Sequence, residues 1–171
     1  MEDKIKYFGY GANSDPEMME AVTGTKLEGT PFVLKGFRFG ILRLPELPRN
    51  VQRILRQDWD PSFRIYSLLR GTYNDSVHGM LWELTEQQLA LVHNWELIGP
   101  LSQEFTVYVE GENSNIFGAR TVMITDPIAR MIVNGESYPP FLNDRERMLS
   151  VARRSREVYL KEQERKSLIE R

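Results

Sequence analysis

Two segments of the chain carry residue types and spacings that could do chemistry, and the first is the loop at residues 9–13, Gly-Tyr-Gly-Ala-Asn. It lies between a strand-like segment and a helix-capping pattern, where free backbone N–H groups and the positive end of the helix dipole favour a small anion. Neither nucleotide signature is present, because a phosphate loop ends in Gly-Lys-Ser/Thr and a dinucleotide fingerprint has a third glycine. The loop is therefore either an anion pocket or a sharp turn that its glycines permit.

Glu96 is the second candidate, in the run Asn-Trp-Glu-Leu-Ile-Gly-Pro at residues 94–100. It follows a predicted short helix and has Trp95, Leu97 and Ile98 as neighbours. Partial burial among them raises the pKa of a carboxyl group toward the range of a general base and acid. The alternative is an exposed glutamate between buried neighbours, and the spacing alone favours that alternative.

Sequence signatures of a metal site or a serine nucleophile are absent. The two histidines, His78 and His93, lie fifteen residues apart with no cysteine and no His-Glu-x-x-His grouping, which predicts no structural metal. No Gly-x-Ser-x-Gly motif marks a serine nucleophile. The sequence therefore leaves the 9–13 loop and Glu96 as the candidates.

Size and composition set the class of protein. The chain has 171 residues, a formal net charge of -2 and 41% hydrophobic residues, which predicts a single domain over residues 1–171 with one packed core. The absence of cysteine favours a reducing, cytoplasmic compartment. The N-terminus lacks a signal-peptide pattern and no stretch approaches the roughly 18 apolar residues of a membrane span. We therefore expect no membrane association.

The C-terminal segment, residues 143–171, is a predicted helical extension rich in charge. It carries 9 Lys and Arg residues against 6 Asp and Glu, with Arg153, Arg154 and Arg156 clustered. Such a cluster could contact phosphates. Because glutamates are interleaved with the basic residues, a solvated helix face is the favoured interpretation, and no nucleic-acid partner is expected. A homodimer is left open.

Hydrophobic spacing and turn residues predict an α+β protein with a mixed or antiparallel sheet and a long C-terminal helix. Capping-box patterns begin helices at Ser14, Thr85 and Asn143. Prolines interrupt residues 43–62, which predicts a long surface loop or lid, and residues 126–143 are also predicted to be irregular. Strands are predicted over residues 5–10, 31–34, 37–42, 77–84, 104–110 and 117–125.

Several motifs occur in the order found in a known family. Residues 7–13, Tyr-Phe-Gly-Tyr-Gly-Ala-Asn, resemble the Tyr-Phe-Ala-Tyr-Gly-Ser-Asn opening of the γ-glutamylcyclotransferases. Residues 34–38 and 77–82 are similar to the second segment and the central strand of that family, and residues 91–96 to the stretch that ends in its catalytic glutamate. The resemblance covers about residues 5–125. It implies a small mixed β-barrel with flanking helices.

The resemblance also implies a reaction. Members of this family close a γ-glutamyl compound into 5-oxoproline and expel an amine, without a cofactor. By resemblance, Glu96 takes and returns the proton, and backbone groups around Gly11, Ala12 and Asn13 hold the α-carboxylate end of a small γ-glutamyl substrate. Tyr7 and Tyr10 belong to the same implied binding set.

Three departures from the family pattern concern the site. Ala12 stands where serine is usual, and Leu97 replaces the glycine that commonly follows the glutamate. The family's later Pro-Ser-x-x-Tyr segment falls at residues 140–144, which read Pro-Phe-Leu-Asn-Asp, so Tyr138 is the nearby ring expected to line the substrate. These departures suggest a non-standard γ-glutamyl substrate or a lost turnover, and the alternative is a non-catalytic small-molecule-binding module on the same fold.

Overall fold

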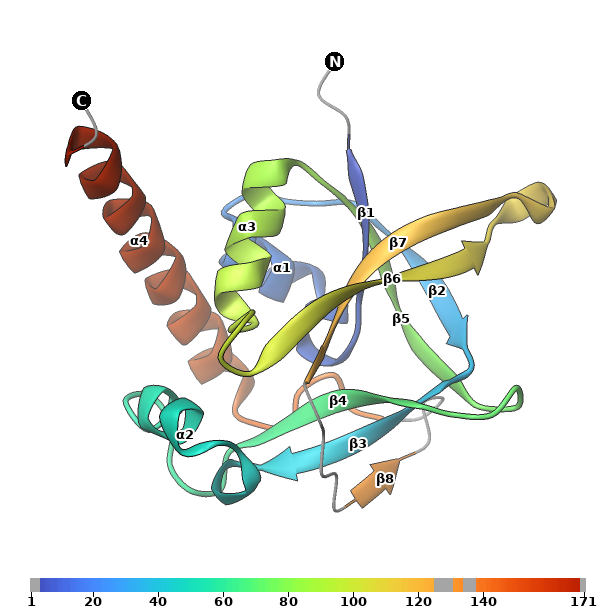
Figure 1. The fold of residues 1–171 in the computed structure, drawn as a ribbon, viewed down its shortest axis with the longest axis horizontal. Helices are drawn as coiled ribbons and strands as arrows, with labels where there is room; N and C mark the ends of the chain where they lie inside the picture. Colours follow the sequence, from blue (N-terminus) through green and yellow to red (C-terminus); the bar gives the residue numbers. More distant parts are fainter. Residues whose placement is uncertain (1–3, 125–130, 134–137, 170–171) are drawn as a thin grey trace.

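The computed structural model describes residues 4–124, 131–133 and 138–169 (Figure 1). The α-helices are α1 (Pro16–Thr23), α2 (Arg49–Leu55), α3 (Glu86–Trp95) and α4 (Arg145–Ile169). Short 3-10 helices span Gly11–Ser14 (η1), Leu44–Glu46 (η2) and Glu112–Ser114 (η3). The strands are β1 (Ile5–Gly9), β2 (Gly29–Lys35), β3 (Phe37–Arg43), β4 (Arg64–Arg70), β5 (Ser76–Leu84), β6 (Ser102–Glu110), β7 (Ile116–Ile124) and β8 (Met131–Val133).

The strands form two sheets. One has the order β2-β5-β1-β7-β6, in which β1 and β7 are parallel and the other pairs are antiparallel; the other has the order β4-β3-β8. The α+β class, the short flanking helices and the long C-terminal helix are confirmed. Over the described residues the strands make two open sheets, however, and not the closed barrel that the resemblance implied.

A shared bend connects the two sheets. β2 continues into β3 through Gly36, whose φ of 81° lies in the left-handed region that glycine adopts readily. The Gly36 amide donates to the Asp75 carbonyl at 2.8 Å, and the Gly71 amide donates to the Gly36 carbonyl at 2.9 Å. The β2–β3 and β4–β5 connections therefore pass from one sheet to the other at the same place.

Two helices begin one residue later than the capping patterns predict. At α1 the carboxylate of Asp15, and not the Ser14 hydroxyl, accepts from the Met18 amide at 3.0 Å. At α4 the Asp144 carboxylate accepts from the Arg147 amide at 2.7 Å. An ionised carboxylate is the better partner for the positive helix terminus, so the aspartate takes the position. The Thr85 capping box at α3 is confirmed.

Residues 43–62 are not the irregular loop that their prolines suggested. Pro48 has a φ of -56° and precedes α2, a position where its missing N–H costs no helical hydrogen bond. Leu44, Val51 and Trp59 are buried in the core. The prolines therefore delimit short helices, and the segment is a packed part of the fold.

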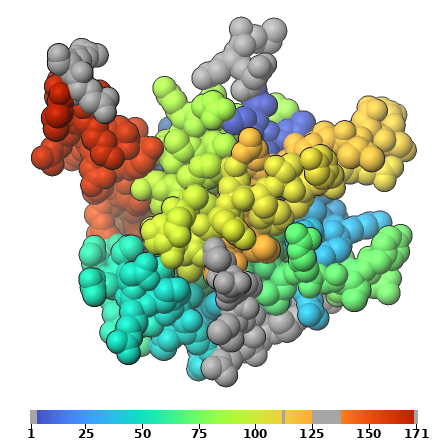
Figure 2. Space-filling view, viewed as in Figure 1, coloured from blue at the N-terminus to red at the C-terminus, as the bar shows by residue number. Residues whose placement is uncertain are grey.

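The long helix α4 leaves the body of the protein along its second half (Figures 1 and 2). In its first half Met148, Leu149 and Ala152 are buried, and the side chain of Asn94 on α3 donates to Ser155 at 3.1 Å. The end of the helix is exposed, as its charge pattern predicts. In the described ranges no helix is both long enough and apolar enough to cross a membrane.

Two arginines of the C-terminal cluster hold α4 to the body. Arg154 is ion-paired with Asp58, which follows α2. Arg156 donates to the carbonyls of Glu20 and Ala21 at the end of α1, at 3.1 and 2.8 Å. Those carbonyls belong to the negative end of the α1 dipole, so the guanidinium is well placed there.

Candidate functional site

The loop after β1 makes one sharp turn into η1. Gly11 has a φ of 57°, and a Cβ atom there would lie 2.9 Å from Cδ2 of Tyr66, so both conformation and space require glycine. The indole N–H of buried Trp82 donates to the Asn13 carbonyl at 2.9 Å. The loop is thus held against β5 and β4 in one conformation.

Asn13 connects this loop to Glu96. Its side chain is buried, and its Nδ2 donates to the Tyr7 hydroxyl at 3.1 Å and to Oε1 of Glu96 at 2.5 Å. Its Oδ1 is buried and has no hydrogen-bond partner among the described residues. A buried acceptor left unpaired is costly, and a ligand N–H group is the kind of donor that would satisfy it.

Glu96 caps the C-terminal end of α3 and turns its carboxylate inward. The side chain is half-buried at the wall of a cavity, and burial raises the pKa of its carboxyl group to about 7, while the hydrogen bond from Asn13 opposes that rise. At neutral pH both protonation states are therefore populated. This is the condition that a group needs in order to accept and return a proton.

The backbone after Glu96 keeps a glycine-like conformation although the residue is leucine. Leu97 has a φ of 51°, and the amide of Ile98 donates to the His93 carbonyl at 3.0 Å. The left-handed conformation costs a non-glycine residue about 1–2 kcal/mol. The side chain of Leu97 packs against the core and lines the cavity, and Glu96 still bonds to Asn13 with leucine at this position.

A cavity of about 190 Å³ lies between the loop, Glu96, α2 and α4. A single water needs about 10–15 Å³ by the same measure, so the cavity admits a ligand of many atoms. Its charged lining residues are Glu96, Asp58 and Arg64. Among the described residues no three metal-ligating side chains come together.

The structure brings six of the seven predicted site residues to this cavity: Tyr7, Tyr10, Gly11, Ala12, Asn13 and Glu96. Tyr138 does not line it. Its ring packs on Phe39 and Tyr66, with centroids 4.2 and 5.2 Å away, and its hydroxyl donates to the His78 carbonyl.

The loop amides differ from the arrangement that the resemblance implied. The Asn13 amide donates to the Tyr10 carbonyl at 3.2 Å. One of the three expected anion donors therefore already has a protein partner. The side chain of Asn13, rather than its backbone, faces the acid.

The wall contributed by α2 and α4 was missed from the sequence. Ile54 and Leu55 on α2, and Met148 and Val151 on α4, line the cavity. The apolar residues Val51, Ile54 and Leu55 have the i, i+3, i+4 spacing of a helix face, which was the available signal. The prolines on either side of this segment favoured the prediction of a loop instead.

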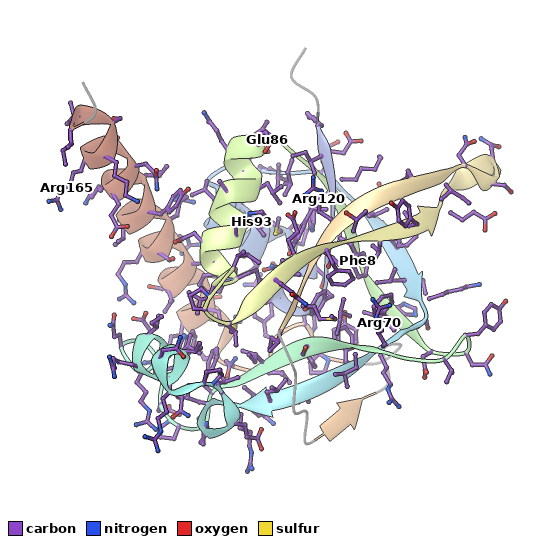
Figure 3. The ribbon with its side chains drawn as sticks, viewed as in Figure 1. Phe8, Arg70, Glu86, His93, Arg120 and Arg165 are labelled. Atoms are coloured by element: carbon purple, nitrogen blue, oxygen red, sulfur yellow. The ribbon has the colours of Figure 1, made fainter. Side chains whose placement is uncertain are left out.

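A second charged cluster lies outside the cavity. Glu104 on β6 pairs with His93 of α3, whose Nε2 is 2.5 Å from its carboxylate, and with Arg120 of β7. Figure 3 shows His93 and Arg120 on these elements. None of the three side chains lines the cavity, so this cluster fastens α3 to the sheet.

Comparisons with known proteins place the fold. No family model matches the chain, and no curated protein matches its sequence. Among solved structures, one described as gamma-glutamyl cyclotransferase superposes with a TM-score of 0.58 at 14% identity, covering 95% of this chain and 85% of that one. An uncharacterized protein from Homo sapiens gives a TM-score of 0.58 at 15% identity, covering 96% and 86%. The chain therefore has the fold of a γ-glutamyl cyclotransferase.

Replacing Asn13 by aspartate tests the contact with Glu96. Two carboxylates about 2.5 Å apart cannot both ionise easily, so Asn13→Asp should make the pair titrate in two steps, with the upper apparent pKa well above 7. Carboxyl ¹³C NMR measures both steps. Asn115→Asp, at an exposed turn, is the control. If both titration steps of Asn13→Asp ended below pH 7, the side chains at positions 13 and 96 would not be in contact.

Proposed function

We propose that the protein is an intramolecular cyclotransferase that releases 5-oxoproline from a γ-glutamyl amine or γ-glutamyl amino acid. The observation that carries the proposal is the contact between the half-buried Glu96 carboxylate and Asn13 at the wall of a cavity that the η1 loop also lines. The fold shared with a γ-glutamyl cyclotransferase supports it. The residues supply acid and base chemistry and positioning, which are what this reaction requires.

The reaction balances within one substrate. The neutral α-amine attacks its own γ-carbonyl carbon, forming the ring C–N bond, while the Glu96 carboxylate accepts a proton from that nitrogen. The bond to the leaving nitrogen then breaks as the protonated carboxyl returns its proton to that nitrogen. The products are 5-oxoproline and a free amine, with no redox change and no water consumed.

The protein contributes proton transfer and orientation. Proton transfer by a placed side chain is worth roughly 10²- to 10⁴-fold in rate, and holding the amine at attack distance from the carbonyl lowers the barrier by several kcal/mol more. Burial raises the pKa of Tyr7 well above its usual value. Its hydroxyl therefore stays neutral beside Asn13 and Glu96.

The assay is direct. Incubate the protein with a panel of γ-glutamyl amines, γ-glutamyl amino acids and glutathione, and measure 5-oxoproline and released amine in equal amounts. Product from at least one compound is the expected result. Binding of a γ-glutamyl compound without product from any of them would instead identify a small-molecule-binding module. We also propose that the protein acts in the cytoplasm, because the chain has no cysteine.

The pH dependence follows from the Glu96 pKa. Because the free enzyme needs the carboxylate to accept the first proton, and the pKa of that carboxyl is about 7, kcat/KM should rise with pH through a midpoint near 7. An unshifted glutamate would place this limb near 4.3. A pH–rate profile from pH 4 to 9 measures it, and a flat profile between pH 5.5 and 8 contradicts the assigned role.

A further inference from the structure

Beyond the Glu96–Asn13 contact, the cavity wall is largely apolar. It is built by three elements distant in sequence, namely α2 with its following turn, the start of β4 and the first half of α4. The apolar side chains that these elements place on the wall are Ile54, Leu55, Trp59, Phe63, Ile65, Met148 and Val151.

The two remaining charged lining residues already have protein partners. Asp58 is ion-paired with Arg154 of α4, and its carbonyl accepts from Arg147. Arg64 is exposed, and its guanidinium donates to the Leu142 carbonyl at 3.3 Å. These pairs tie α2 and β4 to α4 and to the segment before it. The polar lining residues Asn94 and Ser155 bond to each other, and Asn143 bonds to the backbone of Arg64.

This wall bears on the leaving group, because a γ-glutamyl group that contacts Glu96 and Asn13 must extend its amide nitrogen substituent into the rest of the cavity. The α-carboxylate is common to all amino-acid leaving groups, so the wall acts on their side chains, and a charged side chain would lose water there without gaining a partner from the apolar residues, which is costly. An apolar substituent would gain from burial. The lining therefore discriminates between substituents by polarity.

Resting on the proposed function, we infer that the preferred substrates carry a leaving group whose side chain is apolar and of the size of that of leucine or phenylalanine. Leu55 of α2 and Val151 of α4 are specificity-determining residues in this assignment. Both are half-buried and line the cavity, one from each helix.

Paired substrates test the inference. One methylene in an apolar pocket changes kcat/KM by roughly 10- to 200-fold, so γ-glutamyl-leucine should exceed γ-glutamylglycine by about tenfold or more, and γ-glutamyl-glutamate should be the poorest. Equal values for the three compounds, or a preference for the glutamate compound, would overturn the inference while leaving the cyclotransferase activity intact.

Substitutions in the cavity wall test which residues cause the preference for an apolar side chain in the substrate. Val151→Asn should reduce the leucine-to-glycine ratio of kcat/KM by about tenfold, because it places an amide on the apolar wall. The matched control is Val158→Asn, seven residues later on the same helix, where the side chain is 51% exposed. Leu55→Asn, on α2, provides a second test should Val151→Asn fold poorly. An unchanged ratio in both wall variants contradicts the assignment.

Binding separates this inference from the proposed function. If the wild-type protein makes no 5-oxoproline from any compound, the proposed function fails. Calorimetric affinities for the same compounds then still decide the inference: tighter binding of γ-glutamyl-leucine than of γ-glutamylglycine supports an apolar subsite, and equal affinities refute it.

Discussion

Glu96→Gln should lower the rate of 5-oxoproline release by about 10²- to 10⁴-fold, which is the range that a positioned general acid and base contributes. Glutamine has nearly the same shape, and its carbonyl oxygen can still accept the hydrogen bond from Asn13. Substrate affinity should therefore change little while kcat falls. The measurement is kcat and KM on the best substrate of the γ-glutamyl panel.

The same variant should be more stable than the wild type at high pH, which separates lost chemistry from lost folding. A carboxyl group whose folded pKa is about 7 rather than its usual value near 4.5 favours the folded state below pH 4.5, and this contribution is lost as pH rises through 7. The wild type should thus lose roughly 3 kcal/mol over that interval relative to Glu96→Gln.

A glutamate elsewhere on the same helix provides the control. Glu86 is exposed at the first turn of α3 (Figure 3), at the other end of the helix from Glu96. Glu86→Gln should keep its turnover and lose only the small helix-dipole contribution of about 0.3–1 kcal/mol. Equal activity of the wild type and Glu96→Gln would remove the carboxylate from the mechanism.

Gly11→Ala should reduce activity by about 100-fold, the effect expected when a catalytic group or its substrate is displaced by about 1 Å. The new Cβ would lie 2.9 Å from the Tyr66 ring, in a residue whose φ is 57°. The loop must shift to relieve this contact, and the shift moves Asn13 away from Glu96. Activity and thermal unfolding measure the two effects.

Gly36→Ala is the matched control for the backbone effect. Its φ is 81°, but a Cβ there meets no atom within 4 Å. Both variants should therefore lose about 1–2 kcal/mol to the left-handed conformation, while only Gly11→Ala loses activity. Full turnover by Gly11→Ala would mean that the loop conformation does not position the substrate.

Strands and helix ends that are marked by a few neighbouring residues could be predicted from the sequence. Alternating residues gave β6, and the Thr85 capping box gave the start of α3, because period and cap chemistry act over a few residues. The pairing of the strands into two open sheets depends on the bend at Gly36 and its bonds to Asp75 and Gly71. Such contacts join distant segments, and no single pattern encodes them.

The residues of the candidate site could likewise be predicted from local sequence, but the contacts between them could not. The 9–13 loop and Glu96 could be singled out because each lies at the end of a recognisable element. Their contact through the Asn13 side chain, and the burial that raises the Glu96 pKa, arise only when α3 packs against η1 and β1. The sequence spacing favoured an exposed glutamate for that reason.

Titration of the Glu96 carboxyl carbon by ¹³C NMR, with and without 5-oxoproline, tests most directly whether this acid lies in the γ-glutamyl cavity; the spectrum of Glu96→Gln identifies its signal. The structure predicts a midpoint near pH 7 that moves when the ligand binds. A midpoint near 4.5 that does not respond to the ligand would contradict the assignment of this cavity as the active site.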